Sequence, residues 1–229
     1  KLHEAVQENE YDEFGMSKKK KFENLTRQER EAMDLQKVAQ MESLLSSSVL
    51  KKITKKGSDN PDKDLAGLIG IHAVKEKTSE MVARMQFEQD SAKEKKKKRK
   101  RGNMSGSAMS GRHMVFYGSA GVGKTTVARI ITGFLYKYGY IKENKCIEID
   151  GNFLKAGEDS ATKTRLSVQK AYGGVLFIDE AYTIVDGSGG YGKEVVATLI
   201  KEMEDNRDRL IVILAGYKND MKRLLGSNE

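Results

Sequence analysis

The residues with the clearest chemical potential lie at positions 118–125, which read Gly-Ser-Ala-Gly-Val-Gly-Lys-Thr. They fit the phosphate-binding loop (P-loop) pattern G-x-x-x-x-G-K-S/T, and Thr126 follows them. Glycines let the backbone wrap closely around phosphate oxygens, and the helix that follows turns its positive end toward the anion. Lys124 can reach the β- and γ-phosphates, while the Thr125 hydroxyl can ligate Mg²⁺. The loop therefore predicts a Mg-ATP site, bound by Gly118, Ser119, Ala120, Gly121, Val122, Gly123, Lys124, Thr125 and Thr126.

Two adjacent carboxylates, Asp179 and Glu180, follow the apolar run 175–178. Such a pair alone more often caps a helix, but its place downstream of a phosphate loop favours catalysis. Ligands bind at the carboxyl ends of parallel strands, so Asp179 would support the magnesium shell there, directly or through water. Glu180 would orient and deprotonate the attacking water. The predicted catalytic residues are Lys124, Asp179 and Glu180, and the predicted metal ligands are Thr125 and Asp179.

A second apolar run, 210–215, leads to Gly216 and Tyr217. Beside the strand that carries Asp179, this run would deliver Tyr217 near the γ-phosphate. A tyrosine that only covers the edge of the core explains the pattern equally well, and both interpretations stay open.

The elements that must position these residues begin at residue 113, where short apolar runs alternate with helical patterns. We expect strands at 114–117, 146–149, 175–178 and 210–215, and helices at about 124–138, 162–171 and 192–206. Alternation predicts βαβ units, and continuously apolar runs indicate parallel strands covered on both faces. The predicted fold class is therefore α/β, with an open, mostly parallel sheet flanked by helices.

The first 60 residues are polar and rich in charge. A capping-box pattern at Thr26 predicts a helix over about 26–56. Its apolar stripe could pack internally or bind a partner, and consists of Val38, Met41, Leu45, Val49 and Ile53. Pro61 marks the boundary between a predicted helical N-terminal segment, 1–60, and a predicted core, 63–229.

The basic charge gathers in one place. Of the formal net charge of +8, the tract 93–101 (KEKKKKRKR) carries +7, from eight basic residues and one acidic residue. A nucleic-acid-associated ATPase could use such a tract to hold phosphates. No aromatic residue is interleaved for base stacking, so a solvated loop is favoured. The charged and Gly/Ser-rich stretch 87–112 predicts a mobile loop. It follows an amphipathic stretch with Ile71, Val74, Thr78, Met81 and Met85 on one face.

Length and composition limit the classes of protein. The 229 residues leave room for one α/β domain and a smaller appendage. The apolar runs are too short for a membrane span, and no signal-peptide pattern opens the sequence. The single cysteine, Cys146, cannot form an internal disulfide and is expected to be a small buried hydrophobe. These features predict a cytoplasmic protein.

Taken in order, the motifs resemble those of the AAA+ superfamily, and more narrowly the group of the CbbX rubisco activases, stage V sporulation protein K and the ATPases of type VII secretion. The resemblance covers about residues 63–229. It is carried by LAGLIGIHAVK (65–75), HMVFYG (113–118), GKTTVAR (123–129), GGVLFIDEAY (173–182), GKE (192–194), MED (203–205) and AGY (215–217).

The resemblance implies the strand order 5-1-4-3-2 and a hexameric ring with nucleotide at the subunit junctions. It also implies that backbone around Ile69 and Gly70 contacts adenine, and that Tyr217 holds the first sensor position. The arginine finger and the helical lid would lie beyond Glu229, so the lid is expected to be absent. The segment 152–164 stands in place of the central pore loop, but is slightly short and lacks the aromatic residue of relatives.

The leading hypothesis is an AAA+ ATPase that binds and hydrolyses Mg-ATP to remodel a protein client or complex. The alternatives are a nucleic-acid-associated ATPase that uses the basic tract and a slow nucleotide-dependent scaffold.

Overall fold

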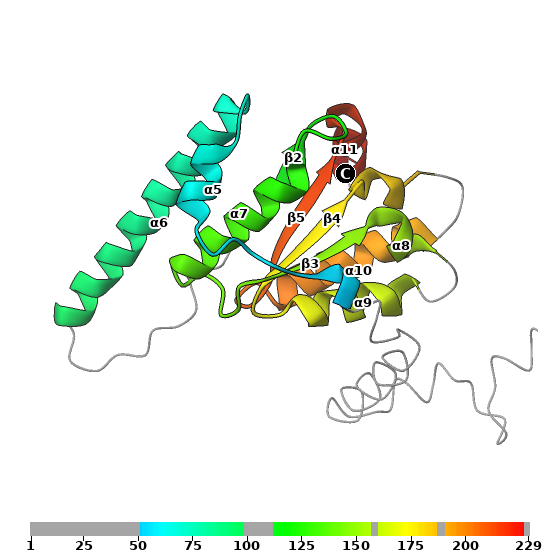
Figure 1. Ribbon diagram of the computed structural model, residues 1–229. Helices are drawn as coiled ribbons and strands as arrows, with labels where there is room; N and C mark the ends of the chain where they lie inside the picture. The colour runs from blue at the N-terminus through cyan, green and yellow to red at the C-terminus, as the bar shows by residue number, and fades with distance from the viewer. Residues whose placement is uncertain (1–50, 99–111, 157–159, 187–190, 227–229) are drawn as a thin grey trace, which may run out of the picture. The chain divides into compact units, whose positions relative to one another are not determined.

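The computed structural model describes residues 51–98, 112–156, 160–186 and 191–226 (Figure 1). Five strands form one sheet in the order β1-β3-β4-β5-β2. Strands β2 to β5 are parallel, and β1 pairs antiparallel with β3. Their bounds are Thr54–Lys56 (β1), Met114–Tyr117 (β2), Lys145–Asp150 (β3), Val175–Asp179 (β4) and Ile211–Gly216 (β5). The predicted α/β class with a mostly parallel five-stranded sheet is confirmed.

Helices flank this sheet (Figure 1). The α-helices are α5 (Pro61–Gly67), α6 (His72–Lys98), α7 (Lys124–Lys137), α8 (Gly151–Lys155), α9 (Ser160–Ala171), α10 (Tyr191–Asp205) and α11 (Lys218–Gly226), and η1 (Ala181–Ile184) is a short 3₁₀ helix. Predicted helices at 124–138, 162–171 and 192–206 correspond to α7, α9 and α10. The short elements α8, η1 and α11 were not predicted, because they hold too few residues for an apolar period.

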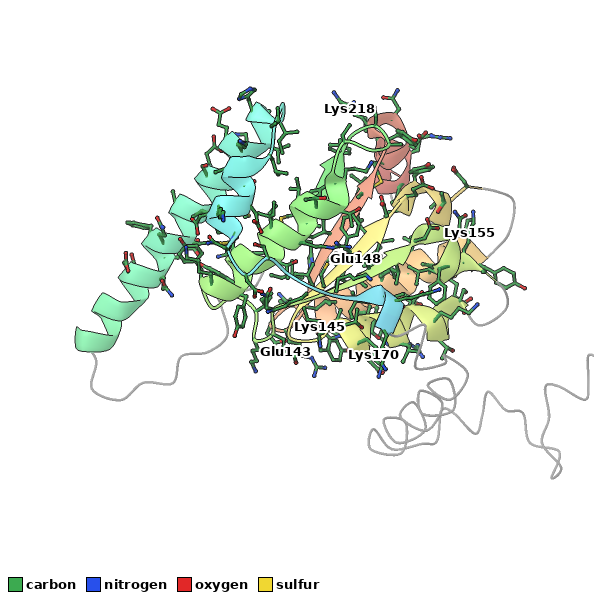
Figure 2. The ribbon with its side chains drawn as sticks, in the orientation of Figure 1. Glu143, Lys145, Glu148, Lys155, Lys170 and Lys218 are labelled. Carbon is green, nitrogen blue, oxygen red and sulfur yellow. The ribbon has the colours of Figure 1, made fainter. Side chains whose placement is uncertain are left out.

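Helix α7 is fixed against the sheet by an ion pair. Arg129 of α7 donates two hydrogen bonds to Glu148 of β3, from Nε to Oε1 at 2.5 Å and from Nη2 to Oε2 at 2.7 Å. Figure 2 labels Glu148 on its strand. The two parallel bonds set the orientation of the helix as well as its distance from the strand. They hold in place the helix that opens at the phosphate loop.

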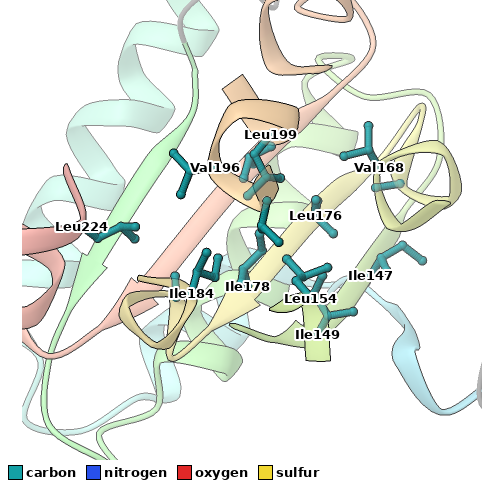
Figure 3. Close-up of a cluster of buried hydrophobic side chains, with 14 of the residues drawn as sticks. Ile147, Ile149, Leu154, Val168, Leu176, Ile178, Ile184, Val196, Leu199 and Leu224 are labelled. Atoms are coloured by element: carbon teal, nitrogen blue, oxygen red, sulfur yellow. The ribbon is translucent and has the colours of Figure 1, made fainter. Parts of the chain in front are cut away.

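The core has two layers, one on each face of the sheet. One layer packs residues of β3, β4 and β5 against α8, α9, α10, η1 and α11 (Figure 3), and includes Ile147, Ile149, Leu154, Val168, Leu176, Ile178, Val195 and Val212. The other packs the alternate strand residues against α6 and α7, and includes Met85, Val127, Ile131, Leu135, Cys146, Val175, Phe177, Ile211 and Ile213. Each fully buried aliphatic side chain contributes about 1.5–3 kcal/mol. Burial on both faces explains the continuously apolar strands, and Cys146 is buried as expected.

The strand order differs from the expected one at a single strand. Counted along the core, the four parallel strands lie in the implied order 1-4-3-2, which is β2-β5-β4-β3. The fifth strand of the sheet is β1, which lies at the other edge, next to β3. The order 5-1-4-3-2 puts strand 5 beside the strand that here is β2. In the described sheet the fifth strand lies beside β3 instead, so the expected order is wrong for this strand.

The helix predicted over 26–56 is wrong at its end, because residues 54–56 form β1. The edge of β3 offers unpaired backbone groups, and pairing with them outweighs continuation of the helix. The backbone contacts extend past the strand, since the Gly57 N–H donates to the Asn144 carbonyl at 3.2 Å. Ile53 packs on the core, whereas the other four stripe residues lie outside the described residues, as does Thr26. The division into 1–60 and 63–229 stays a prediction.

The mobile loop predicted over 87–112 is corrected for its first half, because α6 continues to Lys98. The helix contains no Gly or Pro, and its Lys, Glu, Gln and Arg residues favour helix. An i,i+4 pair between Arg84 and Glu88 adds to this preference. Residues 99–101 of the basic tract, and the side chains of the rest of it, lie outside the described residues. No helix in the described ranges has the length and apolar character needed to cross a membrane.

Candidate nucleotide-binding site

The sheet brings the chemically active segments to one edge. Tyr117 at the end of β2 is paired with Gly216 at the end of β5, and β5 is parallel to β4, which ends at Asp179. The Gly118 N–H donates to the Gly216 carbonyl at 3.1 Å, which extends the ladder by one residue into the loop. The carboxyl ends of three neighbouring strands therefore meet where ligands bind in this type of sheet.

The loop ends in a helix start that is shaped for an anion. Gly121 and Gly123 have φ angles of 74° and 88°, a left-handed conformation that glycine adopts without strain. Gly123 is the N-cap of α7 and supplies no side-chain hydrogen bond to the first turn. The amides of Lys124, Thr125 and Thr126 are thus left for a ligand, and the helix dipole adds positive potential there.

The Lys124 ammonium lies over this loop. Its Nζ donates to the carbonyls of Gly118 at 3.1 Å and Ser119 at 2.9 Å. It also lies 5.8 Å from the centre of the Tyr217 ring, on the other side of the cleft. Phosphate oxygens are charged acceptors and bind an ammonium more strongly than neutral carbonyls do. The lysine is therefore positioned to exchange these carbonyls for phosphate.

The acidic pair sits on a sharp turn. Glu180 has φ 46° and ψ 40°, and it is the one non-glycine residue with positive φ in the described part of the chain. Asp179 accepts the Glu180 N–H on Oδ1 at 3.0 Å. The Glu180 carbonyl accepts from the Thr183 N–H at 2.9 Å and from its Oγ1 at 2.8 Å. A non-glycine residue in this conformation costs about 1–3 kcal/mol, and such strain clusters at functional sites.

A cleft of about 270 Å³ joins these groups. The cleft is lined by residues 120–121 and 123–126 of the loop and the start of α7, by Asp179, Glu180 and Tyr182, and by residues 216–217 at the end of β5. Of the other predicted loop residues, Gly118 and Ser119 hold Lys124 by their carbonyls, and Val122 is about half exposed. Lys124 and Asp179, distant in sequence, therefore share one cleft.

Ile69 and Gly70 do not line this cleft. The Ile69 side chain is 94% exposed, and Gly70 has φ 77°. Their contact with adenine stays a prediction.

Sequence reasoning missed Tyr182. Its ring lies 5.6 Å from that of Tyr217, centre to centre, with a 50° tilt. A Cβ on Gly216 would lie 2.8 Å from Tyr182 Cδ1, so glycine is what lets the ring pack there. Burial, and then the charge of Glu180, raise the pKa of Tyr182 above its ordinary value. The sequence signal was only a Tyr two residues after the acidic pair.

The donors in the cleft fit a triphosphate with its magnesium. The described residues contain no cluster of three or more His, Cys, Asp or Glu side chains suited to a metal. Mg²⁺ does not need one, because it keeps several waters and is usually held by one or two carboxylates plus substrate phosphates. Asp179 and the Thr125 hydroxyl match this pattern, and Lys124 with the free amides matches the phosphates.

Known proteins share these motifs. Residues 114–225 match the ATPase family associated with various cellular activities (AAA). The chain is 46% identical over 128 residues to the ESX-1 secretion system protein EccA1 of Mycolicibacterium smegmatis, covering 53% of this chain and 22% of that protein. It is 40% identical over 166 residues to the chloroplastic ribulose bisphosphate carboxylase/oxygenase activase of Cyanidioschyzon merolae. This match covers 70% of this chain and 53% of that protein. It is 36% identical over 171 residues to stage V sporulation protein K of Bacillus subtilis. This match covers 73% of this chain and 50% of that protein.

These relatives belong to the group that the motifs resemble, so the predicted relationship is confirmed. The chain spans about a fifth of the secretion protein and about half of the other two relatives. Residues 114–225, which form most of the α/β core around the cleft, therefore match the AAA family of ATPases.

Proposed function

We propose that this chain binds Mg-ATP in the cleft between the loop 118–125 and the acidic pair, and hydrolyses it. The observation that carries the proposal is the meeting of Lys124, the first turn of α7 and Asp179 in one cleft. Other arrangements of these residues would leave the phosphates and their cation without a common site.

Each residue has a role set by its chemistry. Lys124 and the amides of the first turn of α7 would bind the β- and γ-phosphates and offset the charge that builds on them in the transition state. Thr125 and Asp179 would hold the cation, which supplies Lewis-acid stabilisation of the phosphoryl oxygens. Glu180 would accept a proton from the attacking water. Tyr217 would stand in the first sensor position, at the tip of β5.

We further propose that hydrolysis drives remodelling of a protein client or complex by a homo-hexamer in the cytoplasm. The support is the similarity to a secretion system protein, a rubisco activase and a sporulation protein. A ring would place the open side of the cleft at a subunit junction, where a neighbouring chain can act on bound nucleotide.

The test uses ATP turnover and ATP affinity of the purified full chain. Glu180→Gln should retain ATP binding and lose at least about 100-fold in kcat, because the proton acceptor is removed. Lys124→Ala should weaken ATP binding by about 10- to 100-fold, which corresponds to the loss of a charge-assisted hydrogen bond. Glu204→Gln is the matched control, because Glu204 is an exposed residue of α10 that pairs with Arg207. Turnover of Glu180→Gln equal to that of Glu204→Gln would refute the catalytic assignment.

The protein client is sought with the same variants. Glu180→Gln in the presence of ATP should trap client protein that is recovered by affinity capture and mass spectrometry. Lys124→Ala, which should not load ATP, is the control for nonspecific capture. Identical protein sets on the two variants would contradict ATP-dependent client binding.

A further inference from the structure

The turn that carries Glu180 is held at its far end by Lys155 of α8. The Nζ of Lys155, which Figure 2 labels, donates to the Thr183 carbonyl and, at 2.8 Å, to the Asp186 carbonyl. Thr183 belongs to η1, and Asp186 follows this helix closely. A cation favours the carbonyl end of a helix, where the last carbonyls lack partners within the helix. Lys155 therefore closes the end of η1 that lies opposite Glu180.

The near end of the same turn rests on the first residue of α8. A Cβ on Gly151 would lie 2.6 Å from Thr183 Oγ1 and 2.7 Å from the Glu180 carbonyl oxygen. Those two atoms are hydrogen-bonded to each other at 2.8 Å. Glycine thus allows α8 to lie directly against the bond that shapes the Glu180 turn.

Helix α8 is itself fixed beside the acidic pair. Asp150, the residue before it, is paired with Asp179 in the β3–β4 ladder and caps α8 by accepting the Asn152 N–H at 2.7 Å. Leu154 is fully buried in the core. A helix of five residues has no stability of its own, so these anchors set its position.

The Glu180 conformation needs such support. Residues in the left-handed region persist only where the surrounding structure holds them there. Gly151 and Lys155 contact the two ends of the turn from a single short helix. A shift of α8 therefore moves the carboxylate that, under the proposed function, faces the attacking water.

We propose that Lys155 is a positioning residue for ATP hydrolysis, which clamps the 180–186 turn and thereby fixes the orientation of Glu180. The proposal rests on the proposed ATPase function. Lys155 acts through the backbone of the turn and does not line the nucleotide cleft. It follows that loss of the clamp lowers the rate of hydrolysis and leaves ATP binding intact.

The test compares Lys155→Met, Lys155→Arg and wild type in the full chain. Met keeps the aliphatic stem and removes the N–H donors, while Arg keeps donors. In Lys155→Met, kcat should fall about 10- to 100-fold, since small misplacements of catalytic groups have effects of this size. The Kd for ATP should change by less than about threefold, and Lys155→Arg should recover most of kcat. Lys77→Met is the control, because it makes the same substitution at an exposed lysine of α6, whose Nζ pairs with Glu80 at 2.7 Å and not with α8 or the turn.

Amide hydrogen exchange in the ATP-bound chain gives a readout that does not depend on turnover. The Thr183 N–H is bonded to the Glu180 carbonyl at 2.9 Å, and the Val185 N–H to the Tyr182 carbonyl at 3.1 Å. Both amides should exchange about tenfold faster in Lys155→Met than in Lys77→Met.

The proposal would be overturned if turnover, or the exchange of these two amides, were the same in Lys155→Met and Lys77→Met. Should wild type bind ATP without hydrolysing it, the proposed function fails separately, and the exchange comparison alone decides whether Lys155 holds the turn.

Discussion

The Lys124 ammonium lies 5.8 Å from the centre of the Tyr217 ring, so the cation of the phosphate loop and the tip of β5 face each other across the cleft. The distance is short enough for an electrostatic attraction between the cation and the ring face. Tyr217 also contacts Tyr182, whose ring centre lies 5.6 Å away. The two tyrosines thus form the wall opposite the residues that would bind phosphate.

The wall gives a first prediction for the Tyr217 hydroxyl. Tyr217→Phe should lower kcat about tenfold, because the ring is kept and one polar group beside the reacting phosphate is lost. The melting temperature of the Tyr217→Phe variant should stay close to that of wild type. Tyr136→Phe, on the exposed part of α7, is the control. Equal kcat for both variants would mean that Tyr217 only covers the edge of the core.

A second prediction concerns Gly216. The added methyl group of Gly216→Ala would lie 2.8 Å from Tyr182 Cδ1 and 2.9 Å from Met221 Sδ, so these side chains must shift. We expect a loss of about 1–3 kcal/mol in the free energy of unfolding, measured by urea denaturation, together with lower turnover. Gly67→Ala is matched, because a Cβ there meets nothing within 4 Å. Equal stability of the two variants would contradict the close packing around Tyr182.

Cys146 provides a probe of folding and ligand binding. Burial raises the pKa of its thiol to about 12, so almost no thiolate exists at pH 8 in the folded chain. Because it is the single cysteine, a thiol reagent should react slowly with the native protein and quickly in urea. Mg-ATP should slow the native reaction further, since ligand binding lowers the population of opened states. Rapid labelling of native protein, unaffected by urea, would contradict this burial.

We expect His113 to make the folded chain less stable at acid pH. Burial lowers the pKa of His113, and its Nδ1 accepts the Val212 N–H at 3.0 Å, which requires a neutral ring. Because the folded pKa lies below the unfolded value of about 6.5, the unfolded chain binds more protons in that window. The contribution is fully present above about pH 6.5 and is lost as the pH falls through the folded pKa.

The comparison between wild type and His113→Asn isolates this group from others that titrate in the same range. The Asn side-chain oxygen can accept the same N–H and does not titrate. Melting temperatures between pH 7.5 and 5 should fall more steeply in wild type. Parallel curves would show that His113 does not contribute to the pH dependence.

The loop 118–125 and the strand ends could be predicted because their function dictates residue type and order. A left-handed backbone demands glycine at positions 121 and 123, and burial on both faces of β4 and β5 demands continuous apolar runs. Both demands can be read from one segment at a time. The sequence of these segments alone therefore predicts that Lys124 and Asp179 lie at one sheet edge.

The residues that sequence reasoning missed depend on contacts between segments. Lys155 and Gly151 matter because a one-turn helix lies against the Glu180 turn, and no local pattern marks that contact. Strand β1 forms because β3 has an open edge, which overrides the local helical pattern around 54–56. Tyr182 is recognisable only once Gly216 leaves room for its ring.

The magnesium dependence of ATP affinity tests most directly whether the phosphate loop and the acidic pair hold one cation and one triphosphate together. Calorimetric titration of ATP with saturating Mg²⁺, and with EDTA, should show clearly tighter binding with the metal in wild type. In Asp179→Asn and in Thr125→Ala most of this gain, about tenfold or more, should disappear, because each removes a ligand or support of the cation. An equal gain from Mg²⁺ in all three proteins would contradict the shared site.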